Sequence, residues 1–156
     1  MIKTQLHEIH GNNRFCGPSA MSAILGISTD HAAAVARQVS GKTSIKGMQT
    51  SHLQAALKTL GCSVRFVALD RSDAPTFAQW AKANRELFDS THVIVVAGRH
   101  FGTVLGKRYL CRLTNGTVPL TALPKARARV TEYLVIDSLP KSLPDAPAPK
   151  KAPASQ

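Results

Sequence analysis

The chain has 156 residues, of which 44% are hydrophobic, and this suits one globular domain with a single core. No apolar run reaches the length of about 18 residues that a membrane-spanning helix needs. The formal net charge of +11 is large for this length and favours anionic partners such as nucleic acid or acidic proteins. Residues 141–156 hold only three lysines and one aspartate, so the first 140 residues still carry 17 basic and 8 acidic side chains.

The N-terminal residues and the cysteines indicate the compartment. Residues 1–8 lack the apolar segment of a signal peptide, so we do not expect export by the general pathway. Cys16, Cys62 and Cys111 are few, odd in number and without CxxC spacing. They indicate neither a disulfide framework nor a zinc site, although a bridge between Cys62 and Cys111 stays open. We therefore expect a cytoplasmic protein without a metal or cofactor.

The first predicted element is a helix that begins near Cys16. Pro18 fits the first turn of a helix and little of its interior. Apolar side chains then recur on one helical face, at Ala20, Ile24 and Leu25. Cys16 should lie at or just before the helix N-terminus, where unpaired amides and the macrodipole favour a thiolate. Such a setting makes a thiol nucleophilic, whereas most free cysteines are small buried apolar residues.

Two further helices and a strand are expected next. One helix spans about 31–39, with Ser28 or Thr29 as its N-cap and Gly41 at its end. Thr50 or Ser51 is expected to cap the next helix, which carries an apolar stripe over 53–60. A strand over 62–69 follows. A fourth helix is predicted to start within 72–75 and to bury Trp80 in the core.

The second half of the chain has the period of β-structure. Strands are predicted over 92–97, 101–105, 107–113 and 129–136, with tight turns at 98–99 and 106–107. Helices followed by a largely antiparallel sheet make an α+β arrangement. Prolines interleaved with Ala, Ser and Lys come last. We therefore expect one folded domain over 1–137 and a disordered tail over 138–156.

Two short motifs resemble those of papain-like cysteine peptidases. Residues 14–20 read Arg-Phe-Cys-Gly-Pro-Ser-Ala, and residues 95–101 read Val-Val-Ala-Gly-Arg-His-Phe. The chain is most similar, over about residues 10–136, to the bacteriocin-processing peptidases that act on double-glycine leaders, and to small single-domain forms in phages. The resemblance implies a papain-like fold, with N-terminal helices packed on the sheet. A Cys-Gly-Pro turn would open the nucleophile helix, and a histidine entering a strand would be the base.

The resemblance therefore assigns Cys16 as the nucleophile and His100 as the general base. A thiolate nucleophile needs a base within hydrogen-bond reach, a group that orients the base, and donors for the oxyanion. His92 begins the preceding strand and becomes the rival base if the predicted register has slipped. For either histidine the alternative is a strand-end residue without a chemical role. The other four read as ordinary polar residues: His7, His10, His31 and His52.

The orienting group is where the chain departs from the family. The phage-like members carry an aspartate beside the place that Cys111 takes here, but this chain has Arg112 there and no carboxylate between 101 and 130. Asn115 is the remaining side chain that could accept a hydrogen bond from the ring, which would make a Cys-His-Asn set. With Gly116 it also forms a strong turn dipeptide.

The oxyanion donor is also altered. The family places a glutamine about six residues before the cysteine, and His10 occupies that position here. Asn12 or Asn13 could substitute, alongside the backbone amide of Cys16. Either asparagine is equally plausible as a loop or capping residue.

Basic side chains form a second cluster in the sequence, besides the candidate catalytic residues. They cluster in and around the predicted sheet, at Arg99, Lys107, Arg108, Arg112, Lys125, Arg127 and Arg129. A charge run of this kind is usually a solvated face, and otherwise a surface for nucleic acid or an acidic partner. The scarcity of aromatic residues argues against base stacking on single strands.

Two functions from different classes are therefore carried forward. The first is a cytoplasmic thiol hydrolase of peptide or isopeptide bonds, which uses Cys16, His100, Asn115 and Asn13. A phage origin, and with it the host cytoplasm or the virion, follows from the resemblance alone. The second is a catalytically impaired, peptidase-like binding or virion-associated module whose third position is lost to Arg112. A nucleic-acid-binding accessory protein is a weaker third reading, and it predicts affinity that falls steeply with salt.

Overall fold

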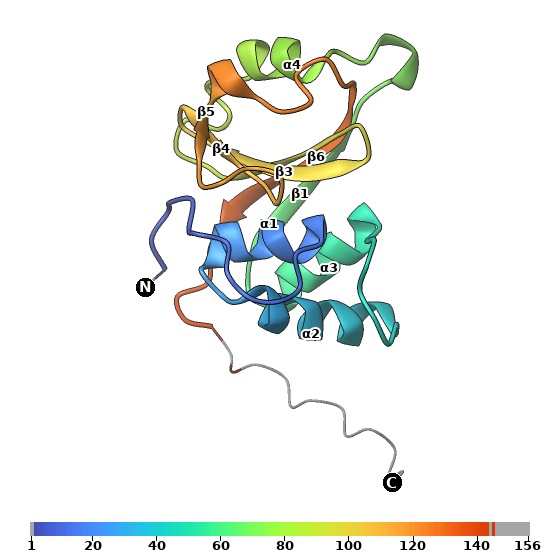
Figure 1. The fold of residues 1–156 in the computed structure, drawn as a ribbon, viewed down its shortest axis with the longest axis vertical. Helices are drawn as coiled ribbons and strands as arrows, with labels where there is room; N and C mark the ends of the chain where they lie inside the picture. Colours follow the sequence, from blue (N-terminus) through green and yellow to red (C-terminus); the bar gives the residue numbers. More distant parts are fainter. Residues whose placement is uncertain (1, 144, 146–156) are drawn as a thin grey trace, which may run out of the picture.

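The computed structural model describes residues 2–143 and 145, and these form an α+β fold. A six-stranded sheet lies between helices α1–α3 on one face and α4 on the other (Figure 1). The strand order is β1-β6-β2-β3-β4-β5, and all neighbouring strands are antiparallel. The predicted α+β class is confirmed.

The helices and strands have the following bounds. The α-helices are α1 (Cys16–Leu25), α2 (Thr29–Ser40), α3 (Thr50–Thr59) and α4 (Phe77–Ala83). The strands are β1 (Ser63–Ala68), β2 (Val93–Ala97), β3 (His100–Leu105), β4 (Arg108–Leu110), β5 (Val118–Pro119) and β6 (Val130–Ser138). Two 3-10 helices complete the set, η1 (Arg71–Asp73) and η2 (Leu120–Ala122). Among the described residues, no helix has the length and apolar character needed to cross a membrane.

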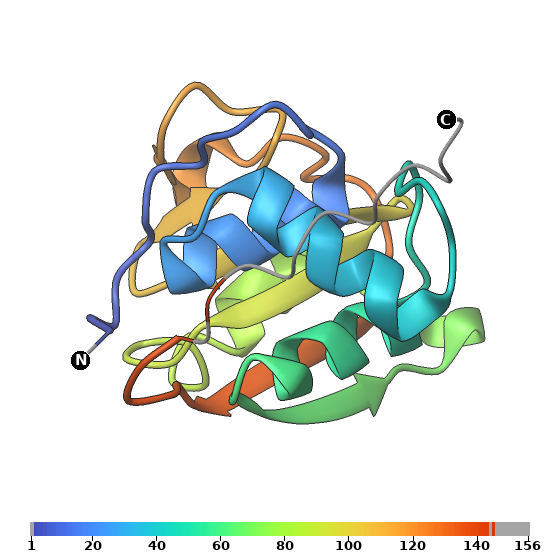
Figure 2. The same cartoon turned by 90° about the horizontal axis from the view of Figure 1, so that it is seen from below.

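Alternation along the central strands divides the core between the two faces of the sheet. Ile94, Val96 and Phe101 pack with α1–α3, which cover one face together (Figure 2). The residues between them face α4 and its aromatic side chains, as Val95 does. The β2–β3 connection is a two-residue turn that places Ala97 opposite His100. His100 therefore shares the α4 face of the sheet with Ala97 and not the face that carries Phe101.

The predicted start and end of α2 are confirmed, but the predicted cap of α3 and the predicted start of α4 were wrong. The Ser28 side chain caps α2 by accepting from the His31 amide, and Gly41 ends it with a φ of 72°. Neither Thr50 nor Ser51 caps α3, because the Thr50 hydroxyl instead donates to a carboxylate oxygen of Glu132. The predicted fourth helix starts later than 72–75, at a capping box that is formed by Thr76 and Gln79.

The last strands and the end of the domain also differ from expectation. The predicted strand over 107–113 ends at Leu110 because the chain turns at 111–116, and the two-residue β5 was not predicted. β6 runs to Ser138, one residue past the predicted boundary at 137, and both Leu139 and Leu143 pack against the helical core. The division into a domain and a tail stays a prediction. The remainder of the predicted tail, 144 and 146–156, lies outside the described residues.

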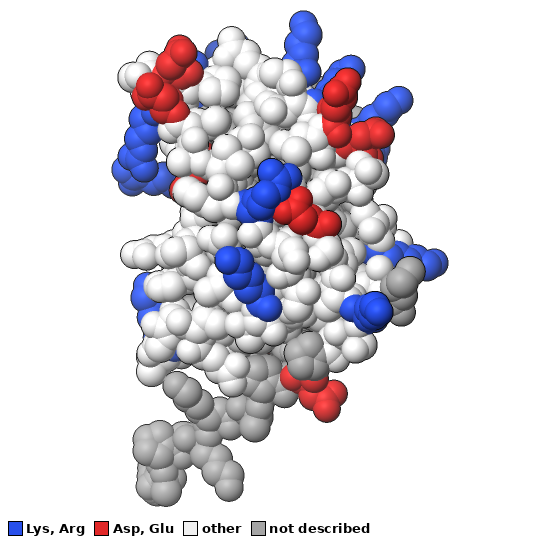
Figure 3. Space-filling view, turned by 180° about the vertical axis from the view of Figure 1, so that it is seen from behind, with Lys and Arg blue, Asp and Glu red and all other residues white. Residues whose placement is uncertain are grey.

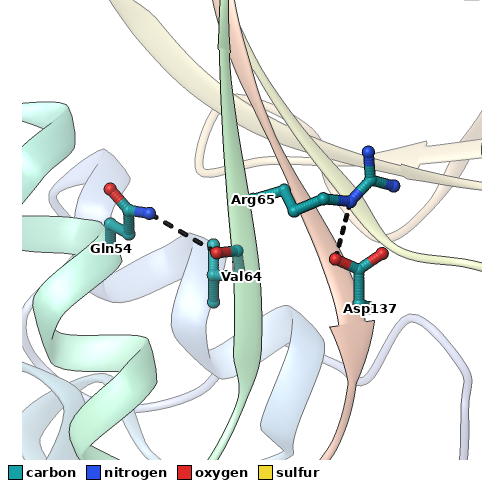
Figure 4. Close-up of polar contacts among 4 residues, drawn as sticks. All are labelled: Gln54, Val64, Arg65 and Asp137. Carbon is teal, nitrogen blue, oxygen red and sulfur yellow. Dashed lines mark hydrogen bonds and ion pairs between the residues drawn. The ribbon is translucent and has the colours of Figure 1, made fainter.

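Polar contacts on either side of β1 hold it between α3 and β6. Gln54 of α3 donates to the Val64 carbonyl oxygen at 3.4 Å, and Arg65 extends away from the helix to Asp137 of β6 (Figure 4). The Arg65 Nε and Asp137 Oδ2 atoms are 2.7 Å apart. Both side chains of this ion pair are exposed, so the pair adds little to stability.

Candidate active site

Cys16 is the first residue of α1, as the sequence predicted. Phe15 is the N-cap residue and its side chain caps nothing, and the first turn contains no acidic residue. The positive end of the helix dipole is therefore not neutralised by the helix's own side chains. Cys16 is half-buried, and a Cβ at the next residue, Gly17, would collide with Met48. The glycine thus allows close packing directly beside the thiol.

The loop before Cys16 is held by α2. The Asp30 carboxylate accepts from the backbone amides of Asn12 (2.9 Å) and Asn13 (3.2 Å). The Asn13 side chain accepts from the Phe15 amide at 3.1 Å and donates to the Ile45 carbonyl oxygen at 3.2 Å. Asn13 therefore fixes the turn that enters α1. Its role as an oxyanion donor stays a prediction, with one amide hydrogen already in use.

His100 begins β3, also as predicted, and its side chain is almost fully buried. The residue is 8% exposed, and its Nε2 atom is buried with no hydrogen-bond partner among the described residues. Burial, followed by the nearby charges of Lys125 and Arg112, lowers the pKa of His100 to about 4. The ring is therefore neutral at pH 7. Arg112, found at the position expected for an acid, disfavours the imidazolium.

His92 is placed away from Cys16 and is not a rival base in this structure. Its Nε2 lies 2.6 Å from the Gln5 carbonyl oxygen, and burial is the main reason that its pKa is lowered. The charge of His7 also lowers that pKa, so His7 lies nearby. The His7 amide in turn donates to the Ala23 carbonyl oxygen in the last turn of α1. His92 thus lies toward the opposite end of α1 from Cys16.

Tyr109 and Arg112 connect the surroundings of Cys16 and His100. A Cβ at Gly102, two residues after His100, would overlap the Tyr109 hydroxyl. Burial is the main cause that raises the pKa of this hydroxyl, and the thiols of Cys111 and Cys16 contribute. Arg112, which affects His100, also lies 3.5 Å from the carbonyl oxygen of Arg14. Tyr109 and Arg112 therefore link the segments that carry Cys16 and His100, while the buried His100 nitrogen has no hydrogen-bond partner among the described residues, the Cys16 thiol included. The pairing of thiol and ring stays a prediction.

Among the described residues, Asn115 makes no hydrogen bond to the buried nitrogen of the His100 ring. It is exposed in the turn after β4 and lines a cavity of about 430 Å³ together with Arg14, Cys111 and Arg112. Neither Cys16 nor His100 lines that cavity. The orienting role that the sequence suggested for Asn115 stays a prediction.

The other cysteines are separated by the sheet. Cys62 packs among the residues of the helical face and Cys111 among those of the α4 face, and both are free thiols. The bridge that the sequence left open is therefore not formed. Burial raises the pKa of Cys62 to about 11, which makes it unreactive at neutral pH. Among the described residues, no group of three His, Cys, Asp or Glu side chains is placed to hold a metal ion.

Sequence reasoning missed Tyr109 and Lys125 as neighbours of the candidate site. Gly102 offered a signal for the first, because a glycine inside an apolar strand often marks a close approach by another group. Lys125 gave no such signal, since it approaches His100 from a loop that is distant in sequence. No protein-family model matches the chain, and no curated protein matches it in sequence.

Proposed function

We propose that the protein is a papain-like thiol hydrolase of the bacteriocin-processing type, which acts on peptide or isopeptide bonds. Cys16 is the nucleophile and His100 is the base. The observation that supports the proposal is the presence of two unusual features on segments that Tyr109 and Arg112 link. A thiol lies at an uncapped helix start, and a buried histidine keeps a ring nitrogen without a partner among the described residues. Buried nitrogens without a partner call for an explanation. His31 Nε2 and Trp80 Nε1 share this feature, so the link to the segment of Cys16 is what distinguishes His100.

The chemistry follows from a neutral imidazole. His100 takes the thiol proton as the Cys16 sulfur attacks the carbonyl carbon, and the oxyanion that forms faces the Cys16 amide, with Asn13 as the side-chain donor. The protonated ring then gives this proton to the leaving amine, and the carbon–nitrogen bond breaks. Water, deprotonated by the same ring, hydrolyses the thioester and frees Cys16. Because Lys125 and Arg112 disfavour a charged ring, we expect the turnover of this enzyme to be slow.

A second candidate function is favoured by those two cations. In it, the domain binds a peptide or an acidic partner and does not turn it over. Arg112 takes the place of the expected acid, and no group among the described residues accepts from the buried His100 nitrogen. Such an imidazole is a weak base, so recognition without hydrolysis is consistent with the same site.

Alkylation of Cys16 separates the two functions. Iodoacetamide is added near pH 6 to the wild type, to His100→Ala and to the control His52→Ala, and labelled cysteines are mapped by mass spectrometry. The hydrolase predicts that Cys16 reacts about tenfold faster than a free thiol, because the neutral His100 ring takes the thiol proton as the sulfur attacks. That excess should be lost in His100→Ala and kept in His52→Ala. Free-thiol rates in all three proteins would contradict the hydrolase and favour the binding module.

A further inference from the structure

A cavity of about 700 Å³ is lined by Arg99 and Phe101, which flank His100, and by Met48, which packs beside Gly17. Neither Cys16 nor His100 lines it. The start of α3, β1, β6 and the β2–β3 turn bound it, and Figure 3 shows the outline hollowed along its left edge, between the two halves of the molecule. Its apolar wall includes Met48, Phe66 and Phe101, and Phe66 is 45% exposed. This volume lies within the range of peptide and small-ligand sites, about 300–1,000 Å³.

Three arginines from distant parts of the chain line this cavity. Arg71 comes from η1, Arg99 from the β2–β3 turn, and Arg129 directly precedes β6. All three are exposed, and within residues 2–143 and 145 none of them forms an ion pair. Arg129 donates from one nitrogen to a backbone carbonyl oxygen at 2.9 Å and keeps its other donors. The cavity therefore offers several guanidinium donors, which suit the geometry of carboxylates.

The single carboxylate in the lining does not cancel this charge. Glu132 accepts from the Thr50 hydroxyl at 2.9 Å, at the start of α3, where no side chain caps the helix. Its negative charge is favourable beside that helix terminus and compensates for the missing cap. One acidic side chain against three arginines leaves the cavity cationic.

Arg99 occupies its place at an energetic cost. Its φ is 61°, in the left-handed region, and it follows Gly98 in a turn where both residues have positive φ. Turns of this type prefer glycine or asparagine, and an ordinary side chain there costs about 1 kcal/mol. A strained arginine that points its charge at a cavity is the pattern expected when the side chain serves a ligand.

We propose that Arg71, Arg99 and Arg129 make this cavity selective for a peptide segment with a carboxylate side chain next to an apolar one. The arginines bind the carboxylate side chain of this segment, and the apolar wall contacts its apolar side chain. This selectivity would define the substrate of the proposed hydrolase, and it rests on that proposed function because it takes the ligand to be a peptide. A nucleic acid fits less well, because a concave site with one exposed aromatic residue offers no track for successive bases.

Binding is tested on full-length Cys16→Ala protein, so that turnover cannot remove the probe. Labelled protein is applied to a hexapeptide array whose two central positions combine every apolar residue with acidic, amide or basic residues. We expect acidic–apolar pairs to bind at least tenfold more tightly than their amide counterparts. Arg71→Gln, Arg99→Gln and Arg129→Gln, each added to Cys16→Ala, should each weaken that binding about tenfold. Arg85→Gln, an exposed arginine outside the cavity, should leave it unchanged.

Other outcomes overturn the inference. The array could show no preference for acidic pairs, or a preference that survives all three cavity substitutions. Either result would show that the arginines do not recognise the peptide. Binding of a ten-residue oligothymidine in place of the peptides, with a steep salt dependence, assigns the cavity to nucleic acid. Because Arg129 also holds a backbone carbonyl, the melting temperature of each variant is measured, and Arg71 and Arg99 alone decide the outcome if Arg129→Gln unfolds. Fast alkylation of Cys16 with an indifferent array would leave the hydrolase standing and remove this inference alone.

Discussion

Two histidines enter neighbouring strands of the same sheet, and their surroundings are opposite. His92 is 1% exposed and its Nε2 lies 2.6 Å from the Gln5 carbonyl oxygen. His100 is 8% exposed, and its buried Nε2 has no partner among the described residues. In both cases burial is the main cause that lowers the pKa. Two cations, Lys125 and Arg112, add to the effect at His100.

The difference shows which of the two side chains serves the fold. A buried imidazole with a hydrogen-bond partner joins the N-terminal segment to the sheet and contributes to stability. A buried imidazole without one costs free energy, so its presence needs another reason, such as chemistry. On this argument His92 is structural and His100 belongs to the site. Each of the following predictions tests one side of that contrast.

Replacing the two histidines should change stability in opposite directions. His92→Ala removes a buried hydrogen bond and leaves a cavity, so we expect a loss of about 2–4 kcal/mol in the free energy of unfolding. His100→Leu removes an unsatisfied nitrogen and keeps the volume, so we expect no loss, or a gain of about 1 kcal/mol. Urea denaturation measures both. Equal losses would show that His100 is as structural as His92.

Restoring an acid beside His100 should raise its basicity. Arg112→Asp removes a cation and adds a carboxylate, so the pKa of His100 should rise from about 4 toward its ordinary value, although burial still lowers it. The alkylation rate of Cys16 near pH 6 should rise with it. NMR titration of the ring measures the pKa, and Arg108→Asp, an equal charge change on β4, is the control. An unmoved His100 in Arg112→Asp would mean that Arg112 does not face the ring.

Acid should destabilise the wild type more than His100→Leu. The pKa of His100 is about 4 when folded and about 6.5 when unfolded, so between these values the unfolded state binds the extra proton. Stability conferred by the neutral ring is therefore full above pH 6.5 and is lost as the pH falls toward 4. His92, whose pKa is also lowered, contributes in both proteins. Between pH 7 and pH 5, the melting temperature of the wild type should fall further than that of His100→Leu. Equal falls in the two proteins would contradict the prediction.

The smallest effect is expected at the turn that leads into His100. Arg99→Gly should relieve the left-handed strain and stabilise the protein by a few tenths to about 1 kcal/mol, despite the entropy cost of glycine. The same change removes one cation from the cavity that the arginines line. Thermal melts check the first effect. A destabilised variant would show that Arg99 supports the fold rather than a ligand.

Local sequence signals were enough to place the candidate nucleophile and base. Pro18 and the apolar stripe after it located the start of α1, and the turn at 98–99 located the start of β3. The start of α4 was missed although a local capping box of Thr76 and Gln79 marks it, whereas the wrong cap of α3 depended on a contact across the fold. Thr50 donates to Glu132 of β6, a partner 82 residues away that no local pattern reveals.

The environment of each site residue could not be predicted, for the same reason. Asn13 looked free to bind an oxyanion, but it is held by Ile45 from a loop 32 residues later. The charges beside His100 come from Lys125 and Arg112, which the fold brings together. The packing of Leu139 and Leu143 on the helical core was not predicted, because the prolines around them indicated a tail.

The most direct test of the account is a ring titration of His100 and His92 by NMR, in the wild type and in Cys16→Ala. We predict that His100 stays neutral down to about pH 4, and that its ring resonances and pKa change in Cys16→Ala while those of His92 do not. That result would join the thiol and the imidazole as one unit. A His100 that titrates near 6.5, or that is indifferent to the loss of Cys16, would contradict the proposed catalytic pair.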